Sequence, residues 1–186
     1  MEKKRKFTPL HRLLHWTIAV AMIVLFATGF LRMYWMNKHK MVDVIASKTQ
    51  ALPKEEMIEI AKAIRAPMWE WHVIFAYLMV FAFIIRIVYM LLKGIKFPNP
   101  FNNTLQLKGR LHGSVYILFY VFVFVSIITG ISIKQGFFPE MKDSIETVHK
   151  LGIYYFPIFV LLHFAGITIA EYTTKKGISS KMISGK

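Results

Sequence analysis

Two histidines, His149 and His163, lie fourteen positions apart in one apolar stretch of the sequence. On an α-helix, fourteen residues rise about 21 Å and complete nearly four turns, so both imidazoles would project from almost the same face. An ionisable side chain inside a bilayer, whose hydrocarbon core is about 30 Å thick, is costly and usually functional. The spacing therefore predicts a helix that holds two metal centres, stacked along the membrane normal.

Two further histidines are placed to supply the opposing ligands. His15 lies near the start of the first apolar segment, and His72 lies near the start of the second. Because chain direction alternates from span to span, His15 is expected at the depth of His163. By the same argument, His72 is expected at the depth of His149. Two histidines that face each other across a helical bundle are the axial ligand set of a six-coordinate b-type haem, which transfers electrons because no coordination position stays open.

Gly29 and Arg86 are expected to face the two predicted haem sites. Gly29 comes fourteen residues after His15, and the missing side chain would let a porphyrin approach the backbone at the outer site. A close contact between helices is the other interpretation of this glycine. Arg86 comes fourteen residues after His72 and would pair with a haem propionate at the inner site. An arginine that snorkels toward the membrane surface is the alternative.

The composition predicts an integral membrane protein. Of the 186 residues, 55% are hydrophobic, and the mean hydropathy is +0.45. We expect a single membrane domain, 1–186, that folds as an all-α four-helix bundle with spans at about 10–33, 68–92, 111–133 and 148–171. In the loop after the first span, a short amphipathic helix is expected at about 54–65. It would lie on the membrane surface or pack on the bundle as a solvated helix.

The charges favour a membrane protein over a nucleic-acid-binding one. The formal net charge is +14, but the basic residues lie between apolar runs. Lys and Arg are denser on the side that holds both termini, so the positive-inside rule predicts cytoplasmic termini and an outer location for the long first connection. The sequence has no cysteine, which excludes disulfides, thiolate-held iron–sulfur clusters and covalently attached c-type haem.

The histidine pattern resembles the di-haem cytochrome b group, which includes bacterial cytochrome b561 and the cytochrome b subunits of nickel–iron hydrogenase and formate dehydrogenase. The resemblance covers about 7–172 and rests on His15, Trp16, His72, His149 and His163. Arg86, with thirteen residues between it and His72, and the motif Lys96-Phe97-Pro98 are also similar to bacterial cytochrome b561. The first connection, 34–67, departs from the pattern because it is longer than in the short bacterial cytochrome b561 proteins.

The resemblance implies two non-covalent b-type haems. The inner one would be held by His15 and His163, and the outer one by His72 and His149. It also implies a multi-pass protein of the bacterial inner membrane that exchanges electrons with the quinone pool. We therefore predict electron transfer across the lipid bilayer between quinone and an outer-side partner, which would be a periplasmic redox protein or enzyme subunit.

Two other functions are compatible with these residues. The chain could be a stand-alone membrane oxidoreductase, acting as a superoxide:quinone oxidoreductase or a ferric reductase, because Lys and Arg in the outer loops could steer an anion. It could also be a haem-free membrane protein that uses its histidines as a relay. His11 and His112, at the cytoplasmic interface, are expected to be solvated, with assistance to quinone protonation as the alternative. His39 is expected to be solvated in the outer loop.

Overall fold

The structure is a computed structural model that describes residues 7–49, 51–95, 99–102, 104, 106–173 and 176–185, without the side chain at 108. The motif Lys96-Phe97-Pro98 lies outside the described residues. All regular elements within them are helical, which confirms the predicted all-α class. The α-helices are α1 (Pro9–Phe30), α2 (Lys38–Lys48), α3 (Lys54–Leu92), α4 (Leu107–Gln135), α5 (Lys142–Lys150), α6 (Gly152–Thr173) and α7 (Ile178–Ile183). A π-helical turn, η1 (Leu31–Trp35), follows α1, and a 3-10 turn, η2 (Pro139–Met141), precedes α5.

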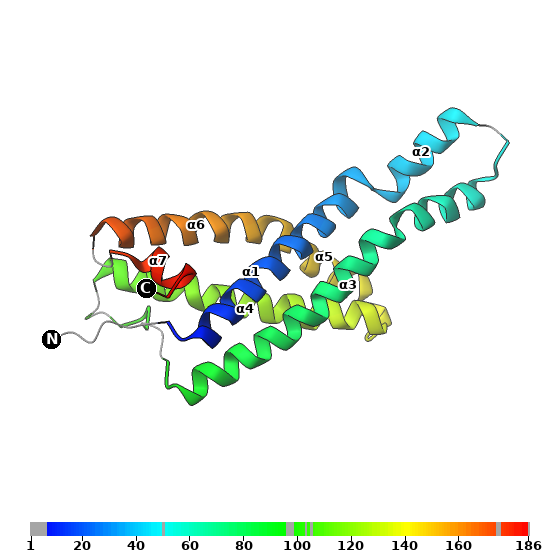
Figure 1. Ribbon diagram of the computed structural model, residues 1–186. Helices are drawn as coiled ribbons and strands as arrows, with labels where there is room; N and C mark the ends of the chain where they lie inside the picture. Colours follow the sequence, from blue (N-terminus) through cyan, green and yellow to red (C-terminus); the bar gives the residue numbers. More distant parts are fainter. Residues whose placement is uncertain are drawn as a thin grey trace.

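Four helical segments of the described chain are long and apolar enough to cross a membrane, as predicted. They are Pro9–Trp35, Lys54–Leu92, Gly109–Gln135 and Pro139–Thr173. Helix α1 packs against α3 and α6, and α4 packs against α6 and α3. Both chain ends lie at one end of this bundle, and α2 with the first part of α3 extends from the other (Figure 1). We call these the terminal end and the hairpin end.

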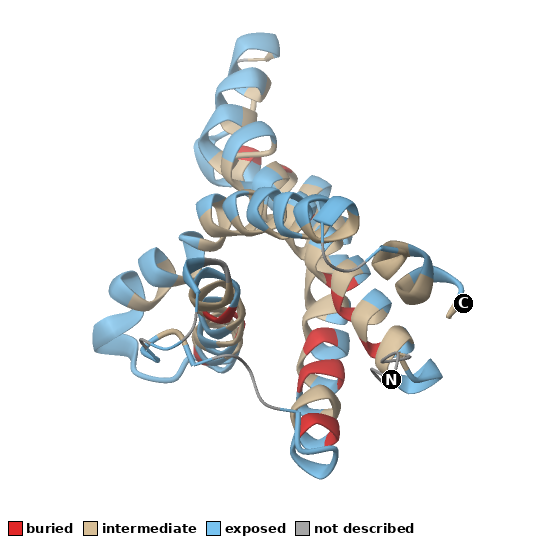
Figure 2. Cartoon of the chain, turned by 90° about the vertical axis from the view of Figure 1, so that its left-hand side faces the viewer, coloured by how far each residue is buried: buried red, intermediate tan, exposed pale blue. Residues whose placement is uncertain are grey.

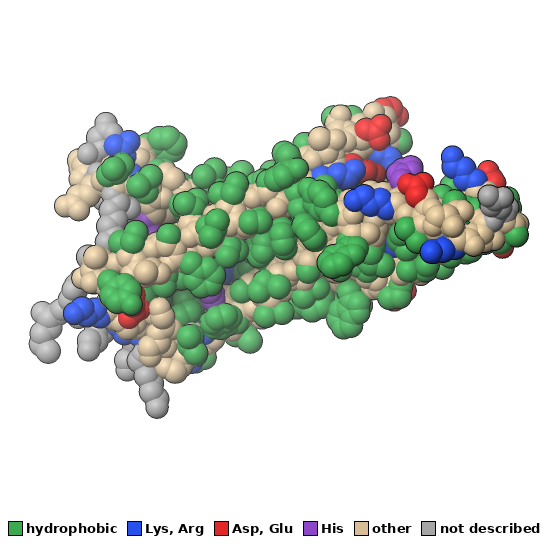
Figure 3. Space-filling model, turned by 90° about the horizontal axis from the view of Figure 1, so that it is seen from above, with side chains coloured by type: hydrophobic (Ala, Val, Ile, Leu, Met, Phe, Trp, Pro, Cys, Tyr) green, Lys and Arg blue, Asp and Glu red, His purple; other side chains and the backbone are tan. Residues whose placement is uncertain are grey.

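Apolar side chains cover most of the outside of the bundle. Hydrophobic residues dominate its middle, whereas charged residues gather toward its two ends (Figure 3). Few residues are buried (Figure 2), and the main buried cluster joins α1, α3 and α4 through Ile18, Ala21, Met79, Ala82, Phe83 and Val123. An exposed apolar surface of this extent is unfavourable in water but matches the hydrocarbon of a bilayer.

The segment at about 54–65, expected as a short amphipathic helix on the membrane surface or packed on the bundle, is not a separate helix. It is the first part of α3, which continues through Pro67 into the membrane-spanning part. Helix α2 packs against α3, and the two form a helical hairpin beyond the bundle (Figure 1). Met57 and Ala61 are buried in this region of α3. Part of the apolar face of the segment therefore packs against protein, whereas Ile64 on the same face is exposed.

The fourth apolar segment forms two consecutive helices rather than one. Helix α5 ends at Lys150, Leu151 forms a turn, and α6 begins at Gly152. Glycine is a poor helix former, and Pro157 lacks the N–H that would bond to the carbonyl four residues earlier, so the first turn of α6 is weakened. His149 and His163 consequently lie on two consecutive helices instead of one.

The C-terminal helix α7 folds back onto the beginning of α1. Glu171 accepts hydrogen bonds from the backbone N–H groups of Gly177, at 2.6 Å, and Ser179, at 3.1 Å. The indole Nε1 of Trp16 then donates to the carbonyl of Met182 at 3.4 Å. These contacts fix Trp16, the neighbour of His15, at the terminal end.

Candidate functional site

The four histidines predicted as ligands lie in two pairs. The rings of His15 on α1 and His163 on α6 have centroids 6.1 Å apart. The rings of His72 on α3 and His149 on α5 have centroids 6.4 Å apart. All four residues are partly buried. We call the first the terminal-end pair and the second the hairpin-end pair, after the ends of the bundle toward which they lie.

Both separations suit two imidazoles on opposite sides of one metal ion. A bond between a metal and an imidazole nitrogen is about 2 Å long, and the ring centroid lies about 1 Å further, so two opposed axial imidazoles have centroids about 6 Å apart. Each pair supplies two nitrogen ligands from different helices. The other ligands of an iron between them would come from a porphyrin, so the chemistry of the donors fits a b-type haem at each pair.

A cavity of about 270 Å³ adjoins the hairpin-end pair, and both of its histidines line it. Gly29 and Gly130 line the same cavity. A Cβ atom on Gly130 would lie 3.1 Å from Cε1 of His149, whereas a Cβ atom on Gly29 would meet no atom within 4 Å. Gly29 therefore leaves open space beside the pair, and Gly130 lets the imidazole of His149 approach the backbone of α4. Both features fit a flat ring held between the histidines.

Two threonine hydroxyls contact the imidazoles of the hairpin-end pair. Thr28 Oγ1 on α1 lies 2.7 Å from Nδ1 of His72, and Thr129 Oγ1 on α4 lies 3.0 Å from Nδ1 of His149. Each hydroxyl also donates to the carbonyl four residues earlier in its own helix, at 2.7 Å in both cases. Because a hydroxyl has only one proton to donate, its oxygen accepts from the imidazole Nδ1–H. The Nε2 lone pair of each histidine then stays available to a metal.

Aromatic and basic side chains surround the hairpin-end pair. The indole of Trp69 stacks on the ring of His72, with centroids 5.3 Å apart and planes 6° apart. The guanidinium carbon of Arg32 lies 4.4 Å from the Trp69 ring centroid, a cation–π contact. Arg32, Lys134 and Lys150 also line the cavity. These positive charges would suit the carboxylate groups that a b-type haem carries.

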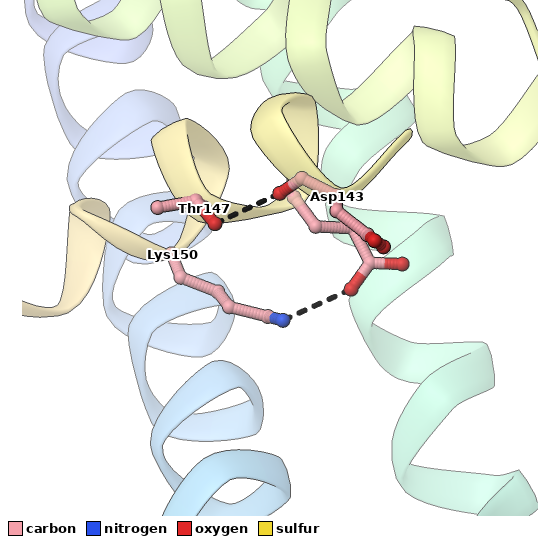
Figure 4. A network of polar contacts seen from close by, with 4 residues as sticks. Asp143, Thr147 and Lys150 are labelled. Atoms are coloured by element: carbon pink, nitrogen blue, oxygen red, sulfur yellow. Dashed lines mark hydrogen bonds and ion pairs between the residues drawn. The ribbon is translucent and has the colours of Figure 1, made fainter. Parts of the chain in front are cut away.

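Local polar contacts stabilise the short helix that positions His149. Lys150 forms an ion pair with Glu146 at 2.9 Å, and the hydroxyl of Thr147 donates to the carbonyl of Asp143 at 2.8 Å (Figure 4). Opposite charges four positions apart stabilise a helix by about 0.2–0.5 kcal/mol. The basic Lys150 also lies in the last turn of α5, where the helix dipole favours a cation.

Aromatic packing dominates the surroundings of the terminal-end pair. The ring of Trp16 meets His15 edge-on at a centroid distance of 5.4 Å. Phe159 stacks on His163 at 5.5 Å, with the planes 22° apart. Among the residues that the structure describes, no hydrogen bond reaches either imidazole of this pair. The two pairs therefore share a spacing but differ in how their rings are held.

Arg86 belongs to a polar cluster at the terminal end. Its Nη2 lies 3.3 Å from Nε2 of His11, and its Nε donates to the hydroxyl of Tyr120 at 3.3 Å. The third nitrogen, Nη1, is buried and has no hydrogen-bond partner within the described part of the chain. Such a group is costly to leave unpaired, so Nη1 is available to an anion such as a haem propionate. His11, expected to be solvated, is instead a partly buried neighbour of Arg86.

Stacked aromatic rings occupy the region between the two pairs. Phe122 of α4 stacks on Tyr155 of α6 at a centroid distance of 3.6 Å, and both residues line the hairpin-end cavity. Phe119 stacks on Phe159 at 4.7 Å, and Phe159 in turn contacts His163. This packing is apolar except for the hydroxyl of Tyr155, which is buried and has no hydrogen-bond partner among the described residues.

Sequence reasoning missed the two threonines that contact the hairpin-end pair. The available signal was a hydroxyl in an apolar span, but Thr28 is 44 positions from His72 and Thr129 is 20 positions from His149. No local pattern links residues so far apart. Of the remaining histidines, His39 is exposed on α2, and the ring of His112 contacts that of Tyr116 at 4.7 Å.

A family model matches almost the whole chain. The family described as prokaryotic cytochrome b561 matches residues 6–185, which include both histidine pairs. No curated protein and no solved structure matched the chain.

Proposed function

The chain belongs to the prokaryotic cytochrome b561 family, and on this premise we propose that it transfers electrons across the bacterial inner membrane between the quinone pool and a periplasmic redox partner. Membership identifies a membrane b-type cytochrome, so haem binding and electron transfer follow from it. The observation that supports the finer proposal is the presence of two histidine pairs, at 6.1 and 6.4 Å, toward opposite ends of one bundle.

In this proposal each pair holds one b-type haem. His15 and His163 would be the axial ligands at the terminal end, and His72 and His149 those at the hairpin end. Each bound haem iron would supply a one-electron couple. With two histidine ligands from the chain, a bound haem iron would have no position free for oxygen.

Two further residues of the chain would support the bound groups. Gly29 would leave room for the porphyrin of the hairpin-end haem, next to the open space that its missing side chain provides. Arg86 would pair through its free Nη1 with a propionate of the terminal-end haem. The apolar helices around both sites would exclude water and lower the local dielectric constant.

The proposed orientation places the terminal end in the cytoplasm. The excess of Lys and Arg beside the two termini supports it through the positive-inside rule. The α2–α3 hairpin then lies in the periplasm, next to the site that an outer partner would reach. In this arrangement the whole chain, 1–186, acts as a single membrane domain.

One observation favours a second candidate, a stand-alone oxidoreductase. Arg32, Lys134 and Lys150 line the hairpin-end cavity, and basic residues at a cavity raise the encounter rate with anions. An anion such as superoxide could then be the electron donor and quinone the acceptor. Purified protein that reduces quinone with superoxide and no partner would support this candidate, as would partner-free reduction of ferric iron for a ferric reductase. Family membership favours both candidates over a haem-free histidine relay.

The test is a haem-to-protein ratio and a reduced-minus-oxidised spectrum of the purified chain, with and without a quinol analogue. We expect two b-type haems per chain and reduction of both by the quinol. A vesicle experiment then assigns direction: quinol inside the membrane should reduce an impermeant electron acceptor on the hairpin side. A haem-free protein, or a haem protein that quinol does not reduce, would contradict the proposal.

A further inference from the structure

The two threonines at the hairpin-end pair form hydrogen bonds with the imidazoles in addition to packing against them. Thr28 and Thr129 come from different helices, yet each places its hydroxyl at Nδ1 of one histidine and bonds to its own helix carbonyl. Thr28 is buried, with 8% of its surface exposed, and Thr129 is partly buried. A buried hydroxyl that satisfies both its donor and its acceptor capacity has a fixed orientation. Each threonine therefore determines which nitrogen of its histidine carries the proton.

We propose that Thr28 and Thr129 are positioning residues that set the reduction potential of the hairpin-end haem. This inference rests on the proposed function, because it requires His72 and His149 to be the axial ligands of that haem. The threonines act through the histidines and do not touch the iron. No residue of the terminal-end pair has an equivalent partner within the described chain, so the effect is confined to one haem.

The direction of the effect follows from the hydrogen bond. An acceptor at Nδ1–H pulls the imidazole proton toward itself and makes Nε2 a stronger electron donor. A stronger donor stabilises ferric iron relative to ferrous iron, so the hydrogen bond lowers the reduction potential. Removing the acceptor is therefore expected to raise the potential of the hairpin-end haem.

The two threonines are not equivalent. Thr28 is buried and its hydroxyl lies 2.7 Å from Nδ1 of His72, whereas Thr129 is partly buried and its hydroxyl lies 3.0 Å from Nδ1 of His149. The hydrogen bond at Thr28 is the shorter of the two and is better shielded from competing polar groups, so its loss costs the imidazole more. The structure thus predicts a larger effect at Thr28 than at Thr129.

The experiment is a spectroelectrochemical titration of both haems in the purified haem-loaded protein. Thr28→Val keeps the shape of the side chain but removes the hydroxyl. It should increase the equilibrium constant for reduction of the hairpin-end haem by about threefold to tenfold, which raises the potential by about 30 to 59 mV for a one-electron couple. Thr129→Val should shift the same haem less. Thr28→Ser, which restores the hydroxyl, should return the potential to that of the unaltered protein.

Ser132→Ala is the matched control. Ser132 is buried on α4 one turn beyond Thr129, and its hydroxyl donates to the carbonyl of Ile128 at 2.9 Å, within its own helix. Its removal should leave both potentials unchanged. Equal shifts of both haems, or no shift in Thr28→Val, would overturn the inference while leaving the proposed function intact. A His72→Ala protein that retains both haems would overturn the inference and the ligand assignment together.

Discussion

The two histidine pairs differ in their support although they share a spacing. At the hairpin end, hydroxyls from α1 and α4 hold the imidazoles, and Trp69 covers one of them. At the terminal end, the rings of Trp16 and Phe159 pack against the pair, and Arg86 contacts His11, one helical turn from His15. A hydrogen bond fixes both the rotation and the proton position of an imidazole, whereas aromatic packing restricts its rotation alone.

The helices that carry the pairs explain part of this difference. His149 lies at the end of the short α5, next to the interruption at Leu151, where the backbone alone provides little restraint. His15 and His163 lie inside the longer helices α1 and α6. A residue near a helix end needs side-chain contacts to keep its direction, and Thr129 provides one.

The largest expected effect comes from removing a ligand. His72→Ala should lose the hairpin-end haem, and His15→Ala should lose the terminal-end haem, so that the haem content falls from two per chain to one. In each variant the affected iron would keep only one histidine ligand. Haem content and the spectrum of the remaining haem distinguish the two variants. His39→Ala, on the exposed helix α2, is the control and should keep both haems. Identical remaining spectra in the two variants would contradict the assignment of two separate sites.

A bulky side chain at Gly130 should disturb the hairpin-end pair alone. Its Cβ atom would already lie 3.1 Å from His149, so Gly130→Leu forces the imidazole to move. We expect haem binding at this site to weaken by at least about tenfold, or about 1.4 kcal/mol. Gly166→Leu is the control, since a Cβ atom there meets nothing within 4 Å. The measurement is haem retention during dilution, and equal retention in both variants would show that Gly130 has no special role.

Removal of one positive charge should lower the reduction potential of the nearer haem and leave that of the other unchanged. Arg86→Gln should lower the terminal-end potential, because a nearby cation disfavours the additional positive charge of ferric iron. Arg32→Gln should lower the hairpin-end potential in the same way. We expect each equilibrium constant for reduction to fall by about threefold to tenfold, which lowers the potential by about 30 to 59 mV. A redox titration that found the same haem shifted in both variants would contradict the placement of these charges.

The smallest effect is expected at the ion pair of α5. Glu146→Gln removes the partner of Lys150, and a pair near the surface contributes at most about 1 kcal/mol to the free energy of unfolding. The free energy of unfolding of the haem-loaded protein, measured by thermal unfolding, should fall by no more than this amount, and both haems should be retained. Glu59→Gln, which breaks the exposed pair with Lys62 on the hairpin, is the comparison. Loss of a haem from Glu146→Gln alone would mean that the pair does more than stabilise its helix.

The sequence by itself determined the membrane-spanning helices and which histidines become neighbours. Long apolar runs leave the backbone no partner in lipid except itself, so helices are required wherever such a run spans the bilayer. The alternation of chain direction then places His15 near His163 and His72 near His149, as the structure shows. Both arguments depend on length and order along the chain, which a sequence contains in full.

Tertiary structure alone decided how the imidazoles are held and that α3 begins well before its membrane-spanning part. The bonds from Thr28 to His72 and from Arg86 to His11 join residues 44 and 75 positions apart, on helices whose rotation about their axes the sequence leaves open. The same holds for α3, which continues through Pro67 with α2 packed against its first part. Each of these features depends on which side chains meet across the bundle, and that is settled only when the helices pack.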